Sequence, residues 1–223
     1  MNESDAHKKL VELLKVDKLR MEILQVVGEC DLSDAYVAAG FLRNLAWDYC
    51  HGFSDSPLND IDVIFFDSSF SAEGSPSADG SLNLAKQKRL EKKVQQQLSL
   101  SLPHLHWDVK NQARMHIKNN HSPYLNTSDA MSWWPELETA VGVKLHNEEL
   151  RFVAPFGLAR LFSCSISHNP KRNVHTFNQR IKKKNWIKHW PKLKPIFSHQ
   201  SLQLPSHNDR RKPLLMKVSY KES

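Results

Sequence analysis

This chain of 223 residues has no long apolar run and only three cysteines. No stretch approaches the ~20 apolar residues that a membrane-spanning helix needs, and the start, MNESDAHKKL, lacks the apolar region of a secretion signal. We therefore expect a cytoplasmic protein without a membrane anchor. Cys30, Cys50 and Cys164 are widely separated and form no C-x-x-C pair, which favours reduced thiols over a disulfide or zinc framework.

The formal net charge of +7 is unevenly distributed along the chain. Residues 1–165 hold 17 Lys and Arg against 22 Asp and Glu, a net charge of −5, whereas residues 166–223 hold 14 against 2, a net charge of +12. A basic C-terminal segment on a mildly acidic body indicates partners that carry phosphate. A tail that only aids solubility is the alternative interpretation.

Hydrophobic periodicity predicts strands and helices in alternation. We expect strands at 35–40, from residue 60 onward, and at 105–109, 141–145 and 150–155. We expect helices within 1–28 and at 41–51, 83–98, 156–162 and 175–189. This order predicts an α/β or α+β fold in which one small mixed sheet is flanked by helices.

The length of the chain suits one full hydrophobic core, with or without a small appendage. We expect a single domain at 1–197, with a core at about 20–165 and a basic helical part at about 166–197. The run 68–81 is rich in Ser and Gly and is expected to be a mobile loop. Residues 198–223, where the apolar signal fades, are expected to form a disordered basic tail.

The most informative segment is NDIDVIFFD, at residues 59–67. Side chains alternate along a strand, so Asp60 and Asp62 share one face with Cα atoms roughly 6.5–7 Å apart, while Ile61 and Val63 face the core. Two carboxylates this close repel by about 3 kcal/mol at an effective dielectric near 20. The pattern predicts a bound Mg²⁺ or Mn²⁺, which prefer oxygen ligands. Two solvated acids at a strand end are the alternative.

Two further features suit metal-assisted nucleotidyl transfer. A strand ends at Gly40 and turns into a helix, whose N-terminus favours the negative charge of a triphosphate. Asp108 lies in a later strand between Trp107 and Val109. If that strand neighbours the one with Asp60 and Asp62, Asp108 completes a two-metal site and helps to deprotonate the attacking hydroxyl. An acid that only caps a strand is the alternative for Asp108.

Several runs of the chain together resemble a bacterial nucleotidyltransferase-like family of the polymerase β superfamily. They are AAGFLRNLAWDYCHG, then NDIDVIFFD, then HWDVKNQARMH. TAVGVKL, RFVAPFGLARLF and RIKKKNWIKHWPKL extend the similarity in the same order, over most of residues 20–195. The resemblance implies a small mixed sheet flanked by helices, with Mg²⁺ and a nucleoside triphosphate at the sheet edge.

The resemblance also assigns roles to single residues. By it, Asp60, Asp62 and Asp108 match the three acidic positions that hold metal, and Gly40 matches the glycine of the phosphate-binding turn. It implies an enzyme that transfers a nucleoside monophosphate from the triphosphate to an acceptor hydroxyl and releases pyrophosphate. The acceptor stays open among RNA, protein and small molecules, because the superfamily modifies all of these.

The chain departs from the family pattern at two places. Phe41 follows Gly40 where most members have Ser or Gly, and Ala159-Arg160 stand where acids are usual. The grip on the triphosphate then depends on the backbone and on Arg43 or Asn44. These departures motivate an alternative, a non-catalytic nucleotide- or RNA-binding module with the same fold. A protein-interaction domain that binds no nucleotide is a third possibility.

Other polar residues have two interpretations each. Arg43 either binds phosphate or pairs with an acid such as Asp48. Asn111 is a further nucleotide-binding candidate, whereas its neighbours Lys110 and Arg114 suit a surface turn equally well. The basic segment 171–194 interleaves lysines with tryptophans, a composition that can bind nucleic acid. We favour the interpretation in which its tryptophans pack on the body and its lysines are solvated.

Overall fold

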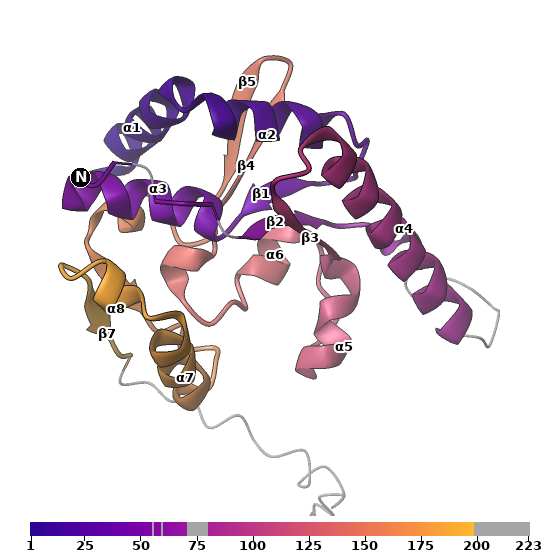
Figure 1. The fold of residues 1–223 in the computed structure, drawn as a ribbon. Helices are drawn as coiled ribbons and strands as arrows, with labels where there is room; N and C mark the ends of the chain where they lie inside the picture. Colours follow the sequence, from indigo (N-terminus) through magenta and orange to yellow (C-terminus); the bar gives the residue numbers. More distant parts are fainter. Residues whose placement is uncertain (55, 59, 71–79, 199–223) are drawn as a thin grey trace, which may run out of the picture.

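The computed structural model describes residues 1–54, 56–58, 60–70 and 80–198. Its centre is a five-stranded sheet in the order β3-β2-β1-β4-β5 (Figure 1). The strands are β1 (Tyr36–Ala38), β2 (Asp60–Phe65), β3 (His106–Asn111), β4 (Gly142–His146) and β5 (Glu149–Val153). β2 and β3 are parallel, and the other neighbouring pairs are antiparallel. The expected small mixed sheet is confirmed.

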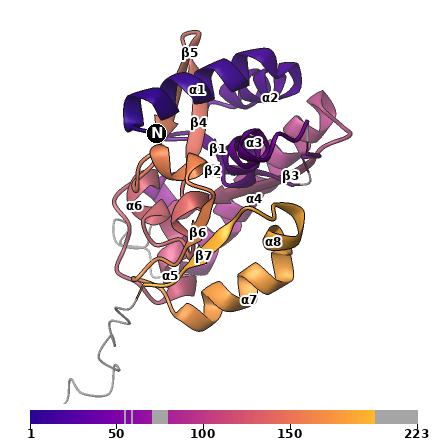
Figure 2. The same cartoon turned by 90° about the vertical axis from the view of Figure 1, so that its left-hand side faces the viewer.

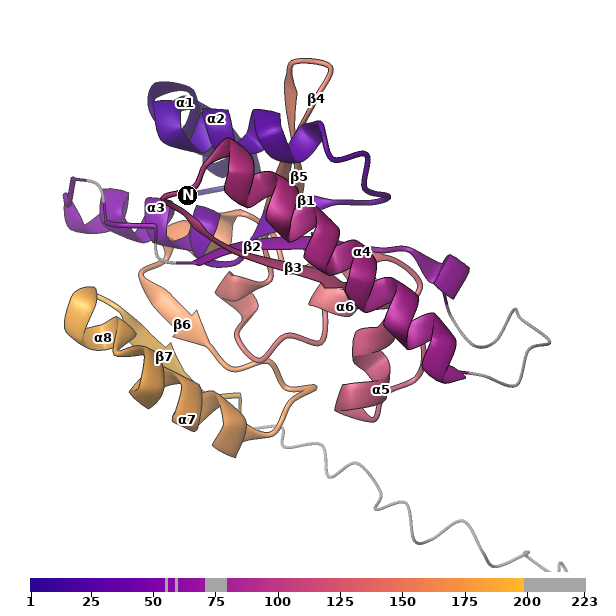
Figure 3. The ribbon, with the colours of Figure 1, turned by 45° about the vertical axis from the view of Figure 1, so that its right-hand side comes forward.

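Four helices pack on one face of this sheet. They are α1 (Glu3–Val16), α2 (Lys18–Gly28), α3 (Gly40–His51) and α4 (Gly80–Ser101). Ile61, Val63 and Val109 point toward these helices and are fully buried. α4 crosses over β2 and β3 (Figure 3), as the connection between two parallel strands requires. The two predicted N-terminal helices and the predicted helix after residue 83 are confirmed.

The opposite face carries a smaller apolar cluster and the acidic residues. Ala38 and Ile64 pack there against Met131 of α6 (Thr127–Met131), with η4 (Leu137–Thr139) nearby; α5 (Met115–Asn119) follows β3. Because side chains alternate along β2, Asp60 and Asp62 share this face with Ile64. The α6 side of the sheet therefore exposes carboxylates beside an apolar cluster.

The C-terminal part forms a small unit of its own beside α3. It contains β6 (Ser165–Ser167) and β7 (Lys194–Ile196), which pair in parallel, and α7 (Val174–Lys184) and α8 (Trp186–His189). Trp47 of α3 packs into its core with Phe177, Trp186 and Trp190. Figures 1 and 2 show α7 and α8 lying below α3. The expectation that Trp186 and Trp190 are packing residues is confirmed.

Two predicted helices are wrong in extent. The segment 156–162 forms only a 3₁₀ turn, η5 (Ala159–Phe162), because Gly157 has φ 86° and the carboxylate of Glu3 accepts the N–H groups of Leu158 and Ala159. The segment 175–189 is divided between α7 and α8, because Asn185 adopts a left-handed conformation with φ 53°. This break turns Trp186 toward the core.

The remaining expectations concern the loop, the tail and the cysteines. Most of the expected mobile loop, residues 71–79, and the expected tail from residue 199 lie outside the described residues. Cys30, Cys50 and Cys164 are free thiols, as expected. In the part of the chain that the structure describes, no helix has the length and apolarity needed to cross a bilayer.

Candidate active site

The carboxylates of Asp60, Asp62 and Asp108 lie on one face of two neighbouring strands. In the parallel register of β2 and β3, Asp62 is directly opposite Asp108, and Asp60 is opposite His106. Neighbouring strands are ~4.8 Å apart, so Asp62 and Asp108 lie side by side. Asp62 is partly buried, Asp60 is exposed, and the Asp108 side chain is 49% exposed. The condition that the two strands are neighbours is therefore met.

The environment of Asp62 disfavours its negative charge. Burial raises the pKa of Asp62 to about 6, and the adjacent charge of Asp108 contributes to the rise. The cations Arg43 and Lys184 act in the opposite direction. A divalent cation between crowded carboxylates relieves such repulsion, and carboxylate oxygens are ligands that Mg²⁺ and Mn²⁺ prefer. The donor set at this position therefore fits a divalent cation.

Asp108 also has a partner on its own strand. Lys110 lies two residues further along β3, and its Nζ donates to Oδ1 of Asp108 at 2.6 Å. The two side chains are 41% and 49% exposed, so this ion pair is weak. Among the described residues, no three His, Cys, Asp or Glu side chains converge as metal ligands do. Asp108 has to turn away from Lys110 to share an ion with Asp62, and the weak pair permits that rotation.

The turn from β1 into α3 brings Gly40 to the same edge of the sheet. Ala38, the last residue of β1, is paired with Asp62. Ala39 follows with φ 55°, a conformation that is rare for a residue with a Cβ atom. Phe41 is 1% exposed and packs in the core, so the residue after Gly40 does not face the site. The first turn of α3 therefore presents backbone N–H groups beside Asp62.

Arg43 lies directly over Gly40. A Cβ atom on Gly40 would be 3.4 Å from Nη2 of Arg43 and 3.5 Å from Nδ2 of Asn44. Arg43 donates from Nη1 to Oγ1 of Thr139 at 3.0 Å and from Nη2 to Oδ1 of Asn44 at 2.9 Å. Burial lowers the pKa of Arg43 to about 10, and its buried Nε has no hydrogen-bond partner. The structure thus brings Gly40, Arg43 and Asn44 together.

Two tryptophans hold the guanidinium of Arg43 in place. Its central carbon is 4.9 Å from the ring centroid of Trp47 and 4.6 Å from that of Trp186. Within the described residues Arg43 forms no ion pair with Asp48, which instead accepts a hydrogen bond from Nε1 of Trp190 at 2.7 Å. The orientation of Arg43 therefore depends on the docking of α8 against α3.

These elements border a cavity of about 560 Å³ between the sheet edge and the C-terminal unit. The acidic lining residues are Asp60 and Asp62, and the basic ones are Arg43, Arg180, Lys184, Lys188 and His189. Asp108 adjoins Asp62 but does not line the cavity. One wall is thus acidic and comes from β2, whereas the basic wall comes from α7 and α8, with Arg43 of α3 beside it. This arrangement suits a ligand that contains both a metal ion and phosphate groups.

The basic wall is the part of the site that the sequence did not identify. Arg180, Lys184 and Lys188 recur at intervals of four, the spacing of residues on one helical face. That signal was present in the basic segment 171–194, but a solvated face gives the same spacing. The lysines are exposed, as we favoured, yet Lys184 and Lys188 face the cavity and not only bulk solvent.

Asn111 lies away from the other candidates. It is fully buried at the opposite end of β3, where Oδ1 accepts the N–H groups of Asp67 and Ala113 and Nδ2 donates to the carbonyl of Asp67. Nearby, Arg114 forms an ion pair with Glu91 of α4 at 2.6 Å. These contacts join the ends of β2 and β3 and give Asn111 a structural role.

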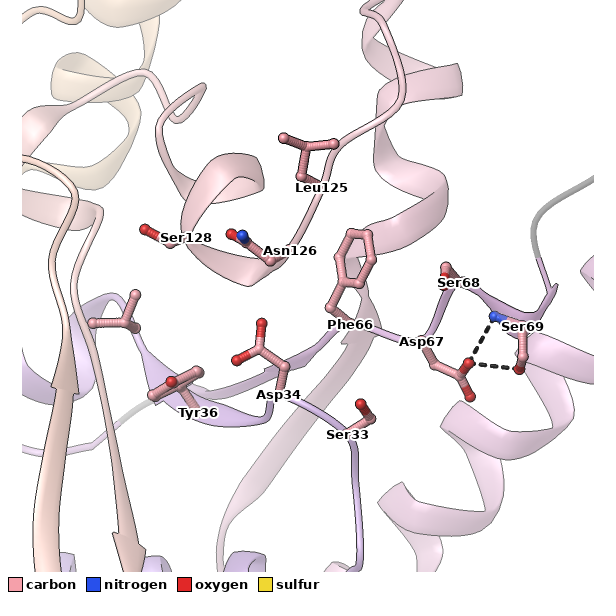
Figure 4. A pocket seen from close by; sticks show the side chains of 11 residues that line it. Ser33, Asp34, Tyr36, Phe66, Asp67, Ser68, Ser69, Leu125, Asn126 and Ser128 are labelled. Carbon is pink, nitrogen blue, oxygen red and sulfur yellow. Dashed lines mark hydrogen bonds between the residues drawn. The ribbon is translucent and has the colours of Figure 1, made fainter. Parts of the chain in front are cut away.

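A second hollow, of about 630 Å³, lies beyond the C-terminal end of β2. Figure 4 shows Asp34, Phe66 and Asn126 lining it, with Tyr36 and Asp67. Asp34 is engaged in accepting the N–H of Thr127 at 2.8 Å. Among the described residues that line this hollow there is no Lys, Arg or His. A hollow without a cation is poorly suited to phosphate, so the cavity beside Asp62 is the better candidate.

Comparisons with known proteins show the family and the fold of this chain. Residues 25–195 match the model of a family described as nucleotidyltransferase. A solved NMR structure, described as revealing a CCA-adding enzyme head domain, is similar over 85% of this chain and 95% of its own, with 32% sequence identity and a TM-score of 0.65. Proteins with curated descriptions give no significant match.

Proposed function

The chain belongs to this nucleotidyltransferase family, and we propose that it transfers a nucleoside monophosphate from a nucleoside triphosphate to an acceptor hydroxyl, with Mg²⁺ or Mn²⁺ as cofactor. The observation that carries the proposal is the alignment of Asp62 with Asp108 beside the first turn of α3. The acceptor class stays open among RNA, protein and small molecules.

The reaction requires an in-line displacement at the α-phosphorus. The acceptor oxygen forms a bond to this phosphorus, the bond to the bridging oxygen breaks, and pyrophosphate leaves. Asp108 is placed to accept the proton of the attacking hydroxyl, because it is exposed next to Asp62. Asp60, Asp62 and Asp108 are the residues that would hold a divalent cation, and that cation would supply positive charge to stabilise the charge on the phosphate.

The chain's own residues position the triphosphate. The backbone N–H groups that begin at Gly40 offer donors at the positive end of α3. Asn44 lies close above Gly40, and Arg43 adds a fixed positive charge. Since Phe41 is buried, no hydroxyl follows Gly40, and the grip on phosphate rests on backbone amides with Arg43 and Asn44.

Thermal unfolding of the purified protein with each nucleoside triphosphate tests the site before an acceptor is known. A ligand at 100 times its dissociation constant stabilises the folded state by about 2.7 kcal/mol. We expect a stabilisation that requires Mg²⁺ and is lost in Asp60→Asn/Asp62→Asn. Glu148→Gln/Glu149→Gln removes the same charge from the exposed β4–β5 hairpin and serves as the matched control.

Transfer itself is measured with α-labelled triphosphates and fractions of cellular RNA, protein and small molecules. Label should enter one fraction with wild type and the hairpin control, and not with Asp60→Asn/Asp62→Asn. Retained transfer by the folded Asp60→Asn/Asp62→Asn variant would contradict the assignment of these two aspartates to the active site. Nucleotide binding that ignores both Mg²⁺ and the aspartates, without transfer, would instead favour the non-catalytic binding module.

A further inference from the structure

Glu136 and Arg180 form an ion pair at the edge of the cavity. The Glu136 side chain is 0% exposed, whereas the Arg180 side chain is 37% exposed and lines the cavity. Arg180 donates from Nε to Oε1 at 2.5 Å and from Nη2 to Oε2 at 3.3 Å. A buried carboxylate without a cation is strongly unfavourable, so Glu136 holds the guanidinium at this wall.

The two hydrogen bonds to Glu136 leave other N–H donors of Arg180 without a partner among the described residues. A guanidinium has five N–H groups, and in the described part of the chain Arg180 directs only two of them to a partner. Lys184 lies one helical turn further along α7, lines the same cavity and is exposed. Both side chains therefore present donors and positive charge to the space in front of Asp62.

Acids of the C-terminal unit do not neutralise this charge. Residues 166–198 contain nine Lys and Arg and no Asp or Glu. Arg43 enters the same electrostatic environment from α3, since its pKa responds to Glu136, Asp62 and Arg180. Arg43, Arg180 and Lys184, together with Lys188 of α8, thus border one cavity, and Glu136 offsets only part of their charge.

We propose that Arg180 and Lys184, together with Arg43, bind the pyrophosphate moiety of the nucleotide substrate, and that Glu136 is the positioning residue for Arg180. Arginine pairs with phosphate oxygens through two parallel N–H groups, and lysine adds a point charge. The claim that the bound pyrophosphate moiety belongs to a nucleotide rests on the proposed function, whereas the claim that this wall binds an anion does not. This wall binds inorganic pyrophosphate without a divalent cation.

Calorimetric titration of the full chain with inorganic pyrophosphate in excess EDTA tests the site directly. We expect saturable binding that Lys184→Gln weakens by roughly fivefold or more, as for loss of one charge-assisted contact. Lys183→Gln is the matched control, because Lys183 is exposed on the same helix but does not line the cavity. Its affinity should stay within about twofold of wild type at equal ionic strength.

Arg180 needs a different variant, because Arg180→Gln alone leaves the buried Glu136 without its cation. Glu136→Gln/Arg180→Gln removes both charges, retains two side chains that can hydrogen-bond, and should fold. We expect it to weaken pyrophosphate binding by roughly tenfold or more. Glu136→Gln keeps the charge of Arg180 but removes the carboxylate that orients it through two hydrogen bonds. In nucleotide transfer this variant should therefore raise KM for the triphosphate more than it lowers kcat.

The outcomes separate this inference from the proposed function. The inference is overturned if wild type fails to bind pyrophosphate in EDTA. It is also overturned if both Lys184→Gln and Glu136→Gln/Arg180→Gln bind pyrophosphate as tightly as wild type does. Neither outcome bears on metal-dependent transfer. Pyrophosphate binding by wild type that Lys184→Gln weakens, together with no detectable transfer by wild type to any of the acceptor fractions, supports the anion site and counts against the proposed function alone.

Discussion

Asp62 of β2 and Asp108 of β3 face each other directly across a parallel pair of strands. Burial raises the pKa of Asp62 to about 6, and the charge of Asp108 adds to that rise. In an unfolded chain an aspartate has a pKa near 3.9. The ionised form of Asp62 is therefore less stable in the metal-free fold than in the unfolded chain. The position that suits a cation thus lowers the stability of the metal-free protein.

The first prediction concerns this contribution and its pH dependence. Because the folded pKa of Asp62 lies above its unfolded value, the folded state binds the proton more tightly, and the contribution of Asp62 to the free energy of unfolding rises as pH falls from 7 toward 4. Asp62→Asn should stabilise the metal-free protein at pH 7.5 by roughly 1–3 kcal/mol. Urea denaturation in EDTA at pH 5 and pH 7.5 measures both effects.

The control for this experiment is Glu148→Gln, which removes one exposed carboxylate far from the pair. It should leave the stability difference between the two pH values unchanged. An Asp62→Asn variant that is less stable than wild type at pH 7.5 would contradict the prediction, because it would mean that the Asp62 carboxylate stabilises the metal-free fold.

The second prediction separates folding from ligand binding at Gly40. In Gly40→Ala the new methyl group makes ordinary contacts with Arg43 and Asn44, so the free energy of unfolding should change by less than about 1 kcal/mol. The same methyl group occupies the space above the first turn of α3, where phosphate must approach. We expect KM for the triphosphate to rise roughly tenfold.

Thermal unfolding and steady-state kinetics on the same preparation test this separation. Gly28→Ala, at the end of α2, is the control, because a Cβ atom there meets only the carbonyl oxygen of Leu145 at 3.6 Å and no cavity. Unchanged KM in Gly40→Ala would show that phosphate does not approach this turn.

The third prediction concerns Arg43. Arg43→Lys keeps the charge but loses the planar group that stacks between Trp47 and Trp186 and bonds to Thr139. We expect a loss of roughly 1–3 kcal/mol in the free energy of unfolding. Urea denaturation measures it, with Arg89→Lys on the exposed side of α4 as the control. Equal stabilities of wild type and Arg43→Lys would show that the packing of the Arg43 guanidinium between Trp47 and Trp186 does not stabilise the fold.

The fourth prediction concerns the contact that docks the C-terminal unit on α3. Asp48 is buried and accepts hydrogen bonds from Nε1 of Trp190 and Oγ of Ser56, both at 2.7 Å. Trp190→Phe removes one donor and should cost about 1–2 kcal/mol of stability. A double-mutant cycle with Asp48→Asn should give a coupling energy above about 0.5 kcal/mol. Additive effects would mean that the hydrogen bond does not join the two parts.

The sequence predicted the helices and strands correctly wherever the hydrophobic periodicity and the turn residues at the ends of an element agreed. The strand with Asp60 and Asp62, the helix after Gly40 and the strand with Asp108 all lie within a few residues of their expected places. The errors at 156–162 and 175–189 have non-local causes. Glu3 satisfies amides 155 and 156 residues further along the chain, and Asn185 turns left-handed where Trp186 enters the core. Neither the contact with Glu3 nor the packing of Trp186 in the core can be predicted from the residues that neighbour these segments in the sequence.

The candidate site shows the same division between local pattern and tertiary contact. By itself the sequence determined that Asp60 and Asp62 share a strand face and that Gly40 begins a helix, because both depend on fixed local periods. Only the tertiary structure decided that Asp62 meets Asp108, that Asn111 is buried away from the site, and that α7 faces the sheet edge. Those relations depend on the pairing of distant strands and on the docking of Trp47 against Trp186 and Trp190, and such contacts leave no period in the chain.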